Sequence, residues 1–187
     1  DLLMGISKQT VNINKLVLGE KANNKIIDYV PHGMNPKIFH PISENSDKYS
    51  EIQKLRKDIA REGEAKFVLF FNSRNIRRKS IPDTLLAWKY FIDQLSEEEA
   101  KSCYFILHTD AVSDAGTDLP AVKDYLFGKD YNNVMLSTNK VTAEQLNNFY
   151  NLADAQILLS SAEGWGLALT EALLTGTPII ANVTGGM

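Results

Sequence analysis

The fold of this chain is decided by residues 155–178, AQILLSSAEGWGLALTEALLTGTP. The apolar run over residues 155–159 predicts a strand of a parallel sheet that is buried on both faces. The segment from Leu167 to Leu174 predicts a helix, which ends at Gly176. Glu163 therefore lies where a strand passes into a helix. That is the carboxyl edge of a sheet, where open α/β folds bind ligands.

Two acidic residues in this stretch, Glu163 and Glu171, stand eight positions apart. At about 1.5 Å of rise per helical residue, they are separated by roughly 12 Å along the axis, about the span of a diphosphate with a sugar at each end. The helix start between them offers free N–H groups and a positive dipole end, both of which favour phosphate. Gly164 and Gly166 let a ligand approach the backbone closely. The alternative is that Glu163 only complements the helix dipole and that Glu171 is a solvated surface residue.

This stretch resembles the signature of the group 1 retaining glycosyltransferases, which have the GT-B fold and move a sugar from a nucleotide diphosphate donor to an acceptor. The resemblance rests on EGWGL at residues 163–167, on Glu171, and on GTPIIA at residues 176–181. It implies that Glu163 contacts the donor sugar and that Glu171 binds the ribose hydroxyls. The donor-binding residues that it adds are Gly164, Trp165, Gly166 and Leu167. Trp165 stands where the family usually has phenylalanine.

A basic loop supports the same interpretation. Residues 72–79, NSRNIRRK, follow the strand-like run 67–71 and carry four basic residues in six positions. Such a loop at the carboxyl end of a strand neutralises a diphosphate well, although an ordinary basic surface loop is the alternative. The family has an arginine and a lysine five positions apart here, and both grip the donor phosphates. The resemblance therefore implies that role for Arg74 and Lys79, which join Glu163 as the predicted catalytic residues.

Two further segments resemble parts of the family. Residues 133–138, NVMLST, form a predicted strand end on whose backbone the nucleotide base rests in the family. The resemblance implies donor contacts at Leu136, Ser137 and Thr138. His108 ends another predicted strand, and either lines the same cleft or is a satisfied strand-end residue.

Residues 29–41, YVPHGMNPKIFHP, form an irregular connection marked by proline and glycine, and they resemble the hinge between the two domains of the family. His32 falls where that hinge faces the cleft. We assign it no catalytic role, because a lone histidine in such a loop is usually a turn residue. We predict that residues 1–41 are the end of an N-terminal acceptor-side domain plus the hinge. Residues 42–187 are then a partial C-terminal nucleotide-sugar-binding domain.

Strands and helices alternate along the predicted second domain. Strands are expected at residues 67–71, 103–108, 133–136, 155–159 and 178–182, and helices at 81–95, 119–127, 142–152 and 166–175. This alternation predicts an α/β protein with a Rossmann-like, doubly wound parallel sheet of GT-B type.

Other elements are expected outside this alternation. Strands near residues 2–6 and 25–30 flank a helix at 8–18, as the tail of a first Rossmann-like domain. A charged amphipathic helix is expected at 49–61. Capping boxes are expected at the start of two helices. One pairs Ser80 as N-cap with Asp83, and the other pairs Thr142 as N-cap with Gln145.

Composition excludes some classes of function. At 44% hydrophobic and 23% charged residues the chain is an ordinary globular protein. Its 20 basic and 23 acidic residues are too balanced to indicate nucleic-acid binding. No apolar run approaches about 18 residues, so no transmembrane segment is expected. The single Cys103 cannot form an internal disulfide, which favours a reducing compartment. We expect a cytoplasmic location and leave peripheral contact with a membrane open.

The chain starts at Asp1 and ends at Met187, directly beyond a predicted strand. We therefore expect a fragment whose sheet is incomplete at the C-terminus. It would carry most of the donor site but little of the acceptor side, so we expect weak donor binding and no turnover by this chain alone. No metal and no cofactor are expected, because the three histidines lack the spacing of metal ligands and fixed cations with a helix dipole can do a metal's work.

The predicted function is glycosyl transfer from a nucleotide-diphosphate sugar to a glycan, lipid or small-molecule acceptor, with retention implied by the resemblance. A nucleotide-sugar epimerase of the same fold remains an alternative, because it would make the same phosphate and ribose contacts. A non-catalytic binding protein of this fold is another, although the charged site residues are all intact. A dinucleotide-dependent oxidoreductase is disfavoured, because the turn after Phe71 lacks the required Gly-x-Gly-x-x-Gly.

Overall fold

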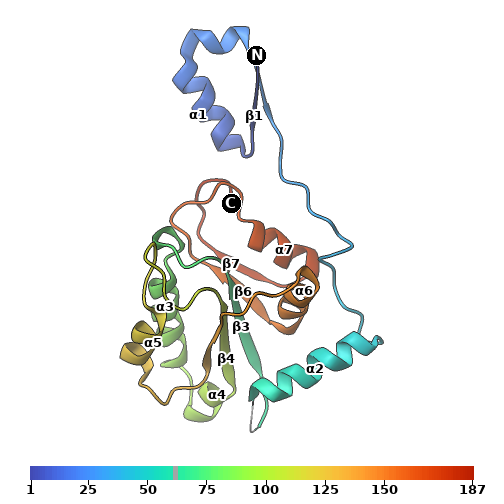
Figure 1. Cartoon of the computed structure of the whole chain (residues 1–187), viewed down its shortest axis with the longest axis vertical. Coiled ribbons are helices and arrows are strands. Elements are labelled where there is room, and N and C mark those ends of the chain that lie inside the picture. Colours follow the sequence, from blue (N-terminus) through green and yellow to red (C-terminus); the bar gives the residue numbers. More distant parts are fainter. Residues whose placement is uncertain (61–62) are drawn as a thin grey trace.

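The computed structural model of this chain describes residues 1–60 and 63–187. Its main body is a five-stranded sheet in the order β5-β4-β3-β6-β7, in which every neighbouring pair is parallel (Figure 1). Counted from its first strand, this is the order 3-2-1-4-5 of a Rossmann sheet. The strands are β3 (Phe67–Asn72), β4 (Cys103–His108), β5 (Val134–Ser137), β6 (Ala155–Leu158) and β7 (Ile179–Ala181).

Helices cover both faces of this sheet, which confirms the predicted doubly wound α/β fold (Figure 1). One face carries α3 (Ile81–Ile92) and α5 (Leu119–Phe127), and the other carries α2 (Asp47–Ala60), α6 (Ala143–Leu152) and α7 (Leu167–Thr175). Side chains of β3 alternate between the two hydrophobic clusters, with Leu69 and Phe71 in one and Val68 and Phe70 in the other. Both faces of the strand are buried, which explains why it is a continuous apolar run.

The predicted elements are present, and their ends differ from the predictions by a few residues. The helix expected at 81–95 ends at Ile92, and the helix expected at 49–61 is α2, which starts at Asp47. The predicted end of the latter, residue 61, lies outside the described residues. Among the described residues, one α-helix was not predicted. It is α4 (Glu97–Lys101), a five-residue helix opened by a capping box between Ser96 and Glu99.

The predicted capping box at Ser80 is wrong. Ser80 has left-handed backbone angles, φ 48° and ψ 43°, and its side chain makes no capping hydrogen bond. The short 3₁₀ turn Arg77–Lys79 directly before α3 causes this, because the Ser80 N–H closes that turn on the Arg77 carbonyl at 3.1 Å. A capping side chain needs extended backbone, which Ser80 does not have here. The box at Thr142 is confirmed, with its hydroxyl accepting from the Gln145 N–H at 3.2 Å.

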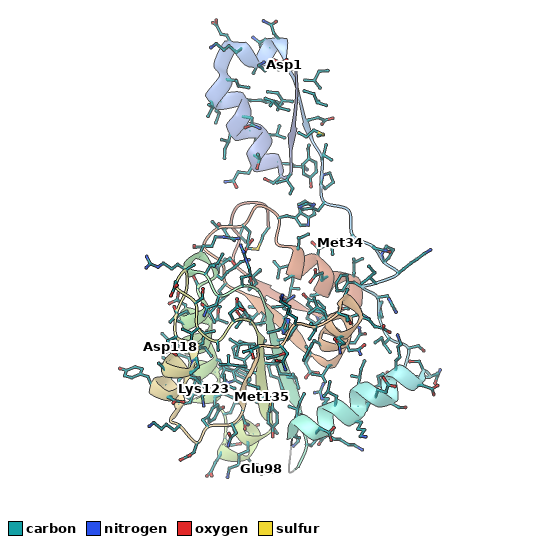
Figure 2. All side chains as sticks on the ribbon, viewed as in Figure 1. Asp1, Met34, Glu98, Asp118, Lys123 and Met135 are labelled. Atoms are coloured by element: carbon teal, nitrogen blue, oxygen red, sulfur yellow. The ribbon has the colours of Figure 1, made fainter. Side chains whose placement is uncertain are left out.

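A small βαβ unit precedes the main body and stands apart from it in Figure 1. It consists of β1 (Leu2–Gly5), α1 (Lys8–Leu18), the 3₁₀ helix η1 (Gly19–Asn24) and β2 (Ile26–Tyr29), with the two strands parallel. An extended segment joins it to the body, and Met34 in that segment packs against the cluster that contains Phe70 (Figure 2). Further along, the His40 N–H donates to the Asn147 side chain of α6 at 3.0 Å.

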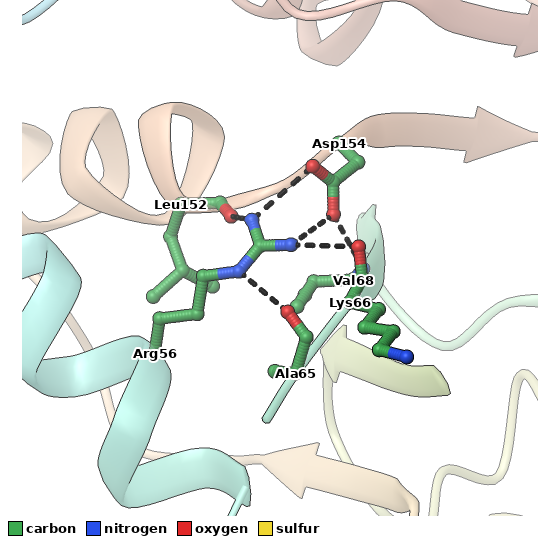
Figure 3. A network of polar contacts seen from close by, with 6 residues as sticks. All are labelled: Arg56, Ala65, Lys66, Val68, Leu152 and Asp154. Atoms are coloured by element: carbon green, nitrogen blue, oxygen red, sulfur yellow. Dashed lines mark hydrogen bonds and ion pairs between the residues drawn. The ribbon is translucent and has the colours of Figure 1, made fainter. Parts of the chain in front are cut away.

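An arginine network holds the sheet at the edge opposite to the strands' carboxyl ends (Figure 3). Arg56 of α2 forms a bidentate pair with Asp154, at 2.6 and 3.2 Å, just before β6. Arg56 also donates to the backbone carbonyls of Ala65 at 2.8 Å, Lys66 at 3.1 Å and Leu152 at 3.1 Å. Asp154 also accepts from the Val68 N–H at 2.7 Å. These polar contacts link the amino ends of the strands, whereas the cavity lies at their carboxyl ends.

Candidate nucleotide-sugar site

A cavity of about 550 Å³ opens at the carboxyl edge of the sheet. The ends of four strands contribute to it, namely Asn72 from β3, His108 from β4, Ser137 from β5 and Leu158 from β6. The strand order reverses between β3 and β6. After β3 the chain adds β4 and β5 on one side of β3, and then β6 and β7 on its other side. Ligands of doubly wound folds bind at such a switch point.

Every predicted site residue except one lines this cavity. Those that line it are Arg74, Lys79, Ser137, Thr138, Glu163, Gly164, Trp165, Gly166, Leu167 and Glu171. The exception is Leu136, whose side chain packs against the hydrophobic cluster on the α3 side of the sheet. The residues are brought together from segments far apart in the sequence, while the roles assigned to them remain predictions.

The Glu163 side chain is 6% exposed. The Lys79 ammonium contacts its Oε1 atom, and Arg78 Nη1 lies 3.0 Å from its Oε2 atom. Burial alone would raise the pKa of this carboxyl, but hydrogen bonds from Lys79 and Arg78 outweigh burial and lower it. Glu163 is therefore held as a carboxylate between two cations.

Arg74 differs from these two cations in having no hydrogen bond or ion pair from its side chain to the part of the chain that the structure describes. It is exposed and lines the cavity. Its loop is nevertheless fixed, because the neighbouring Asn75 is buried and its amide bridges the carbonyls of Asp110, at 3.1 Å, and Thr117, at 2.6 Å. An arginine on an anchored loop, without an internal partner, is well suited to receive an anion from solvent.

The N-terminus of α7 faces the same cavity. Gly166, the N-cap residue, has φ 84°, a conformation that glycine adopts without strain. The first helical residues, Leu167 and Ala168, line the cavity, and their N–H groups have no helical acceptor four residues back. These groups and the helix dipole add positive potential next to Arg74 and Lys79.

Residues 185–187, at the end of the chain, pack over residues 163–166, which we call the Glu163 turn. The Gly186 N–H donates to the Glu163 carbonyl at 2.9 Å, and a Cβ atom on Gly185 would lie 2.1 Å from that carbonyl oxygen. Trp165 in the turn donates from Nε1 to the Thr170 hydroxyl at 2.9 Å. Its ring meets the ring of His32 edge to face, with centroids 5.9 Å apart. His32 also lines the cavity, as the hinge resemblance implied.

Glu171 also lines the cavity, and its carboxylate accepts hydrogen bonds from Tyr150 and Asn72. The Tyr150 hydroxyl donates to its Oε2 atom at 2.5 Å, and Asn72 Nδ2 lies 3.5 Å from the same oxygen. Burial raises the pKa of Glu171, and the Tyr150 hydrogen bond opposes that shift. The alternative of a solvated surface residue is wrong, because Glu171 is partly buried and lines the cavity.

His108 satisfies both of the alternatives left open for it. It lines the cavity, and its Nδ1 atom lies 3.1 Å from the Ser137 hydroxyl. Its ring stacks on Phe149 with centroids 5.9 Å apart. Burial lowers the pKa of His108, which keeps the ring neutral near pH 7.

Several residues at the site were missed by sequence reasoning. Arg78 was part of the basic loop, but its spacing gave no reason to single it out. Asn72 could have been noticed as the polar end of an apolar strand, whereas Tyr150 carries no signal in the sequence. Asn139 and Lys140, directly after the predicted base-binding segment, also line the cavity.

Within residues 1–60 and 63–187, no group of three or more His, Cys, Asp or Glu is arranged to hold a metal ion. Over the same described ranges, every helix is too short or too polar to cross a bilayer.

Comparison with known proteins agrees with this geometry. Residues 127–187 match the family model described as glycosyl transferases group 1. The match covers 61 of the 187 residues, and we call these 61 residues the group 1 segment. The group 1 segment contains Glu163, Glu171 and the whole of α7. A stretch of 61 residues is also 36% identical to the trehalose synthase of Pyrococcus horikoshii, covering 32% of this chain and 15% of that protein.

Solved structures extend the likeness beyond the group 1 segment. WaaG, a glycosyltransferase involved in lipopolysaccharide biosynthesis, matches with a TM-score of 0.71 and 15% identity over 98% of this chain and 45% of its own. The trehalose-6-phosphate structure from E. coli bound with UDP-2-fluoro glucose matches with a TM-score of 0.74 and 14% identity, over 100% of this chain and 47% of its own. The fold is thus that of the GT-B glycosyltransferases, and the chain spans less than half the length of these relatives.

Proposed function

We propose that the cavity binds a nucleotide-diphosphate sugar and that this chain forms the donor side of a glycosyltransferase. The observation that carries the proposal is the convergence of Arg74, Lys79, the α7 N-terminus, Glu163 and Glu171 on one cavity at the switch point of the sheet. The group 1 family match over residues 127–187 supports it, as does the UDP-2-fluoro glucose bound to the E. coli relative.

The cations would act on the leaving group. When the bond between the sugar carbon and the diphosphate oxygen breaks, negative charge builds up on the diphosphate. The N–H groups of Leu167 and Ala168 are fixed by the helix before the reaction, and Arg74 stands on a loop that Asn75 anchors. Lys79 joins them when it exchanges Glu163 for the diphosphate. Preorganised donors of this kind stabilise developing charge without the cost of reorientation. We propose that this transfer needs no metal ion and retains the anomeric configuration.

Glu163 would orient the sugar. Its carboxylate is ionised and contacts Lys79 and Arg78. A donor diphosphate competes with it for Lys79. Once Lys79 binds the phosphates, the carboxylate is free to accept hydrogen bonds from the sugar hydroxyls.

Glu171 would bind the ribose, and Leu136, Ser137 and Thr138 would support the base through their backbone. Glu171 and Ser137 line the cavity from α7 and β5, so the ribose and base would extend away from the Glu163 turn. The acceptor, which we propose to be a glycan, a lipid or a small molecule, would approach from the side of residues 1–41. Residues 42–187 would then be the donor domain of a cytoplasmic enzyme.

Calorimetry tests the donor site. A panel of nucleoside diphosphates and their sugars is titrated into this chain and into its Glu171→Ala variant. Hydrogen bonds to a charged group are worth roughly 1.5–3 kcal/mol, so the variant should bind the preferred nucleotide about 10- to 100-fold more weakly. If the folded chain binds none of the panel, or binds equally well without Glu171, the proposal is wrong and a non-catalytic protein of this fold becomes the better account.

A second experiment separates transfer from epimerisation, the remaining alternative. The complete protein is incubated with the preferred nucleotide sugar with and without a mixture of sugar acceptors, and the products are followed by NMR with and without EDTA. Transfer with retention that EDTA does not affect supports the proposal in full. Formation of an epimer without any acceptor would overturn the transferase assignment.

A further inference from the structure

Tyr150 of α6 is the fully buried aromatic residue behind the cavity. Its ring packs edge to face on Phe70, with centroids 5.2 Å apart, and on Phe39, with centroids 6.0 Å apart. Its carbonyl accepts a hydrogen bond from the Thr177 hydroxyl at 2.8 Å. Both the ring and the backbone of Tyr150 are therefore held in place, so its hydroxyl has a fixed position.

That hydroxyl has a defined direction of donation. Asn72 Nδ2 donates to it at 2.9 Å, and an amide nitrogen can only donate. The single hydroxyl proton is thus left for Glu171 Oε2, which lies 2.5 Å away. Burial keeps the pKa of Tyr150 well above its ordinary value, so the hydroxyl does not lose this proton near neutral pH.

The series of hydrogen bonds from Asn72 through Tyr150 ends on a single oxygen of Glu171. Oε2 receives both contacts, whereas Oε1 has no hydrogen-bond partner among the described residues. Glu171 lines the cavity, and Oε1 is the oxygen that remains for a ligand.

We infer that Tyr150, assisted by Asn72, is a positioning residue that occupies Oε2 of Glu171 and presents Oε1 to the vicinal hydroxyls of the donor's ribose. The inference rests on the proposed function and adds to it the source of selectivity for a ribonucleotide over a deoxyribonucleotide. A ligand without these hydroxyls would leave a partly buried, preoriented carboxylate oxygen unpaired, which is costly. Without the tyrosine hydroxyl, Glu171 could turn and satisfy itself with water.

The test measures discrimination rather than affinity alone. The ribonucleoside diphosphate that binds this chain most tightly, and its 2′,3′-dideoxy analogue, are titrated calorimetrically into the wild type, Tyr150→Phe and Tyr104→Phe. Tyr104 is a matched control because its hydroxyl is also buried, donates to the Ala60 carbonyl at 3.0 Å, and does not line the cavity. The wild type should prefer the ribonucleotide by about 10- to 100-fold.

Tyr150→Phe should reduce this preference by about tenfold, mainly by weakening binding of the ribonucleotide. Tyr104→Phe should leave the preference unchanged, even if both variants melt at lower temperature. An unchanged preference in folded Tyr150→Phe would overturn the inference and leave Tyr150 a structural residue. If the wild type itself binds nucleotides without any preference, or binds none, the ribose assignment of Glu171 fails first.

If Tyr150→Phe does not fold, Asn72→Ala gives the same readout, because Asn72 lies at the end of β3 and is only half-buried. It removes the donor that directs the tyrosine proton. A lower preference for the ribonucleotide in this variant supports the inference, and an unchanged preference contradicts it.

Discussion

The Lys79 ammonium and the Glu163 carboxylate form an ion pair in the cavity wall, although 84 positions separate them in the sequence. Their side chains are 11% and 6% exposed. The two residues are assigned to different parts of the ligand, Lys79 to the diphosphate and Glu163 to the sugar. They satisfy each other in the structure, so donor binding has to exchange one partner for another.

Replacing Glu163 by glutamine should tighten the binding of inorganic pyrophosphate. The substitution removes the carboxylate that competes for Lys79 and Arg78. Because a hydrogen bond to a charged group is worth roughly 1.5–3 kcal/mol, the expected gain is at least about tenfold by calorimetry. Glu144→Gln is the control, since Glu144 pairs with Lys48 on the surface, away from the cavity. Weaker pyrophosphate binding by Glu163→Gln would show that the carboxylate does not compete with the phosphates.

Replacing Arg74 by alanine should weaken nucleoside diphosphate binding by about 10- to 100-fold, the value of a charge-assisted hydrogen bond. Stability should change little, because Arg74 is exposed and its side chain has no partner within the described ranges. Arg77→Ala is the matched control: Arg77 is an exposed arginine of the same loop that does not line the cavity. Equal losses of binding in the two variants, measured by calorimetry at two salt concentrations, would indicate only a diffuse basic surface.

The two glycines of the Glu163 turn should behave differently when replaced by alanine. Gly166→Ala should lower the free energy of unfolding in urea by about 1–3 kcal/mol, because Gly166 has φ 84° and the new Cβ atom would lie 3.1 Å from the Met187 side chain. A Cβ atom on Gly164 meets no atom within 4 Å, so that variant should keep its stability. It should nevertheless bind the donor more weakly, since the methyl group enters the cavity. Unchanged donor binding by Gly164→Ala would place the ligand elsewhere.

Glu171→Gln should stabilise the chain relative to the wild type as pH rises. Burial raises the pKa of Glu171 in the folded state, so its contribution to stability is present below the unfolded pKa and lost as pH rises through the folded one. The variant does not titrate, and its advantage in urea unfolding should grow between about pH 4 and pH 7.

Glu163→Gln should show the opposite pH dependence of stability in urea unfolding. Cation contacts lower the pKa of Glu163 despite its burial, so its contribution is present above the unfolded pKa and lost as pH falls through the folded one. The glutamine variant should therefore lose stability relative to the wild type as pH rises. Parallel pH profiles for the two variants would contradict the different environments of the two carboxylates.

The parts of the fold that depend on local sequence were predictable. The run 67–71 is apolar throughout because both faces of β3 are buried, and Gly176 ends α7 with φ 79°, as its position after an apolar helix suggested. Ser80 was mispredicted, because a 3₁₀ turn before the helix took it out of the extended region that a cap requires. The five-residue α4 is too short to show a periodic pattern.

The site was predictable only as a set of residues, not as a set of contacts. The spacing of Glu163 and Glu171, and of Arg74 and Lys79, pointed to the cavity because these residues follow strand ends that meet at one edge of the sheet. The pairing of Lys79 with Glu163, and of Tyr150 with Glu171, depends on which helices lie side by side. Tyr150 carries no signal in the sequence, because its ring is an ordinary part of the core and only its hydroxyl reaches the site.

The central claim is that a nucleotide-diphosphate sugar lies in this cavity with its diphosphate on Arg74, Lys79 and the α7 N-terminus. The most direct test is a crystal structure of the chain with the nucleotide sugar that it binds most tightly. We predict phosphate oxygens within hydrogen-bond distance of the Arg74 guanidinium and the Leu167 N–H, and ribose hydroxyls on Oε1 of Glu171. A nucleotide bound outside the cavity, or bound with its ribose away from Glu171, would contradict the account.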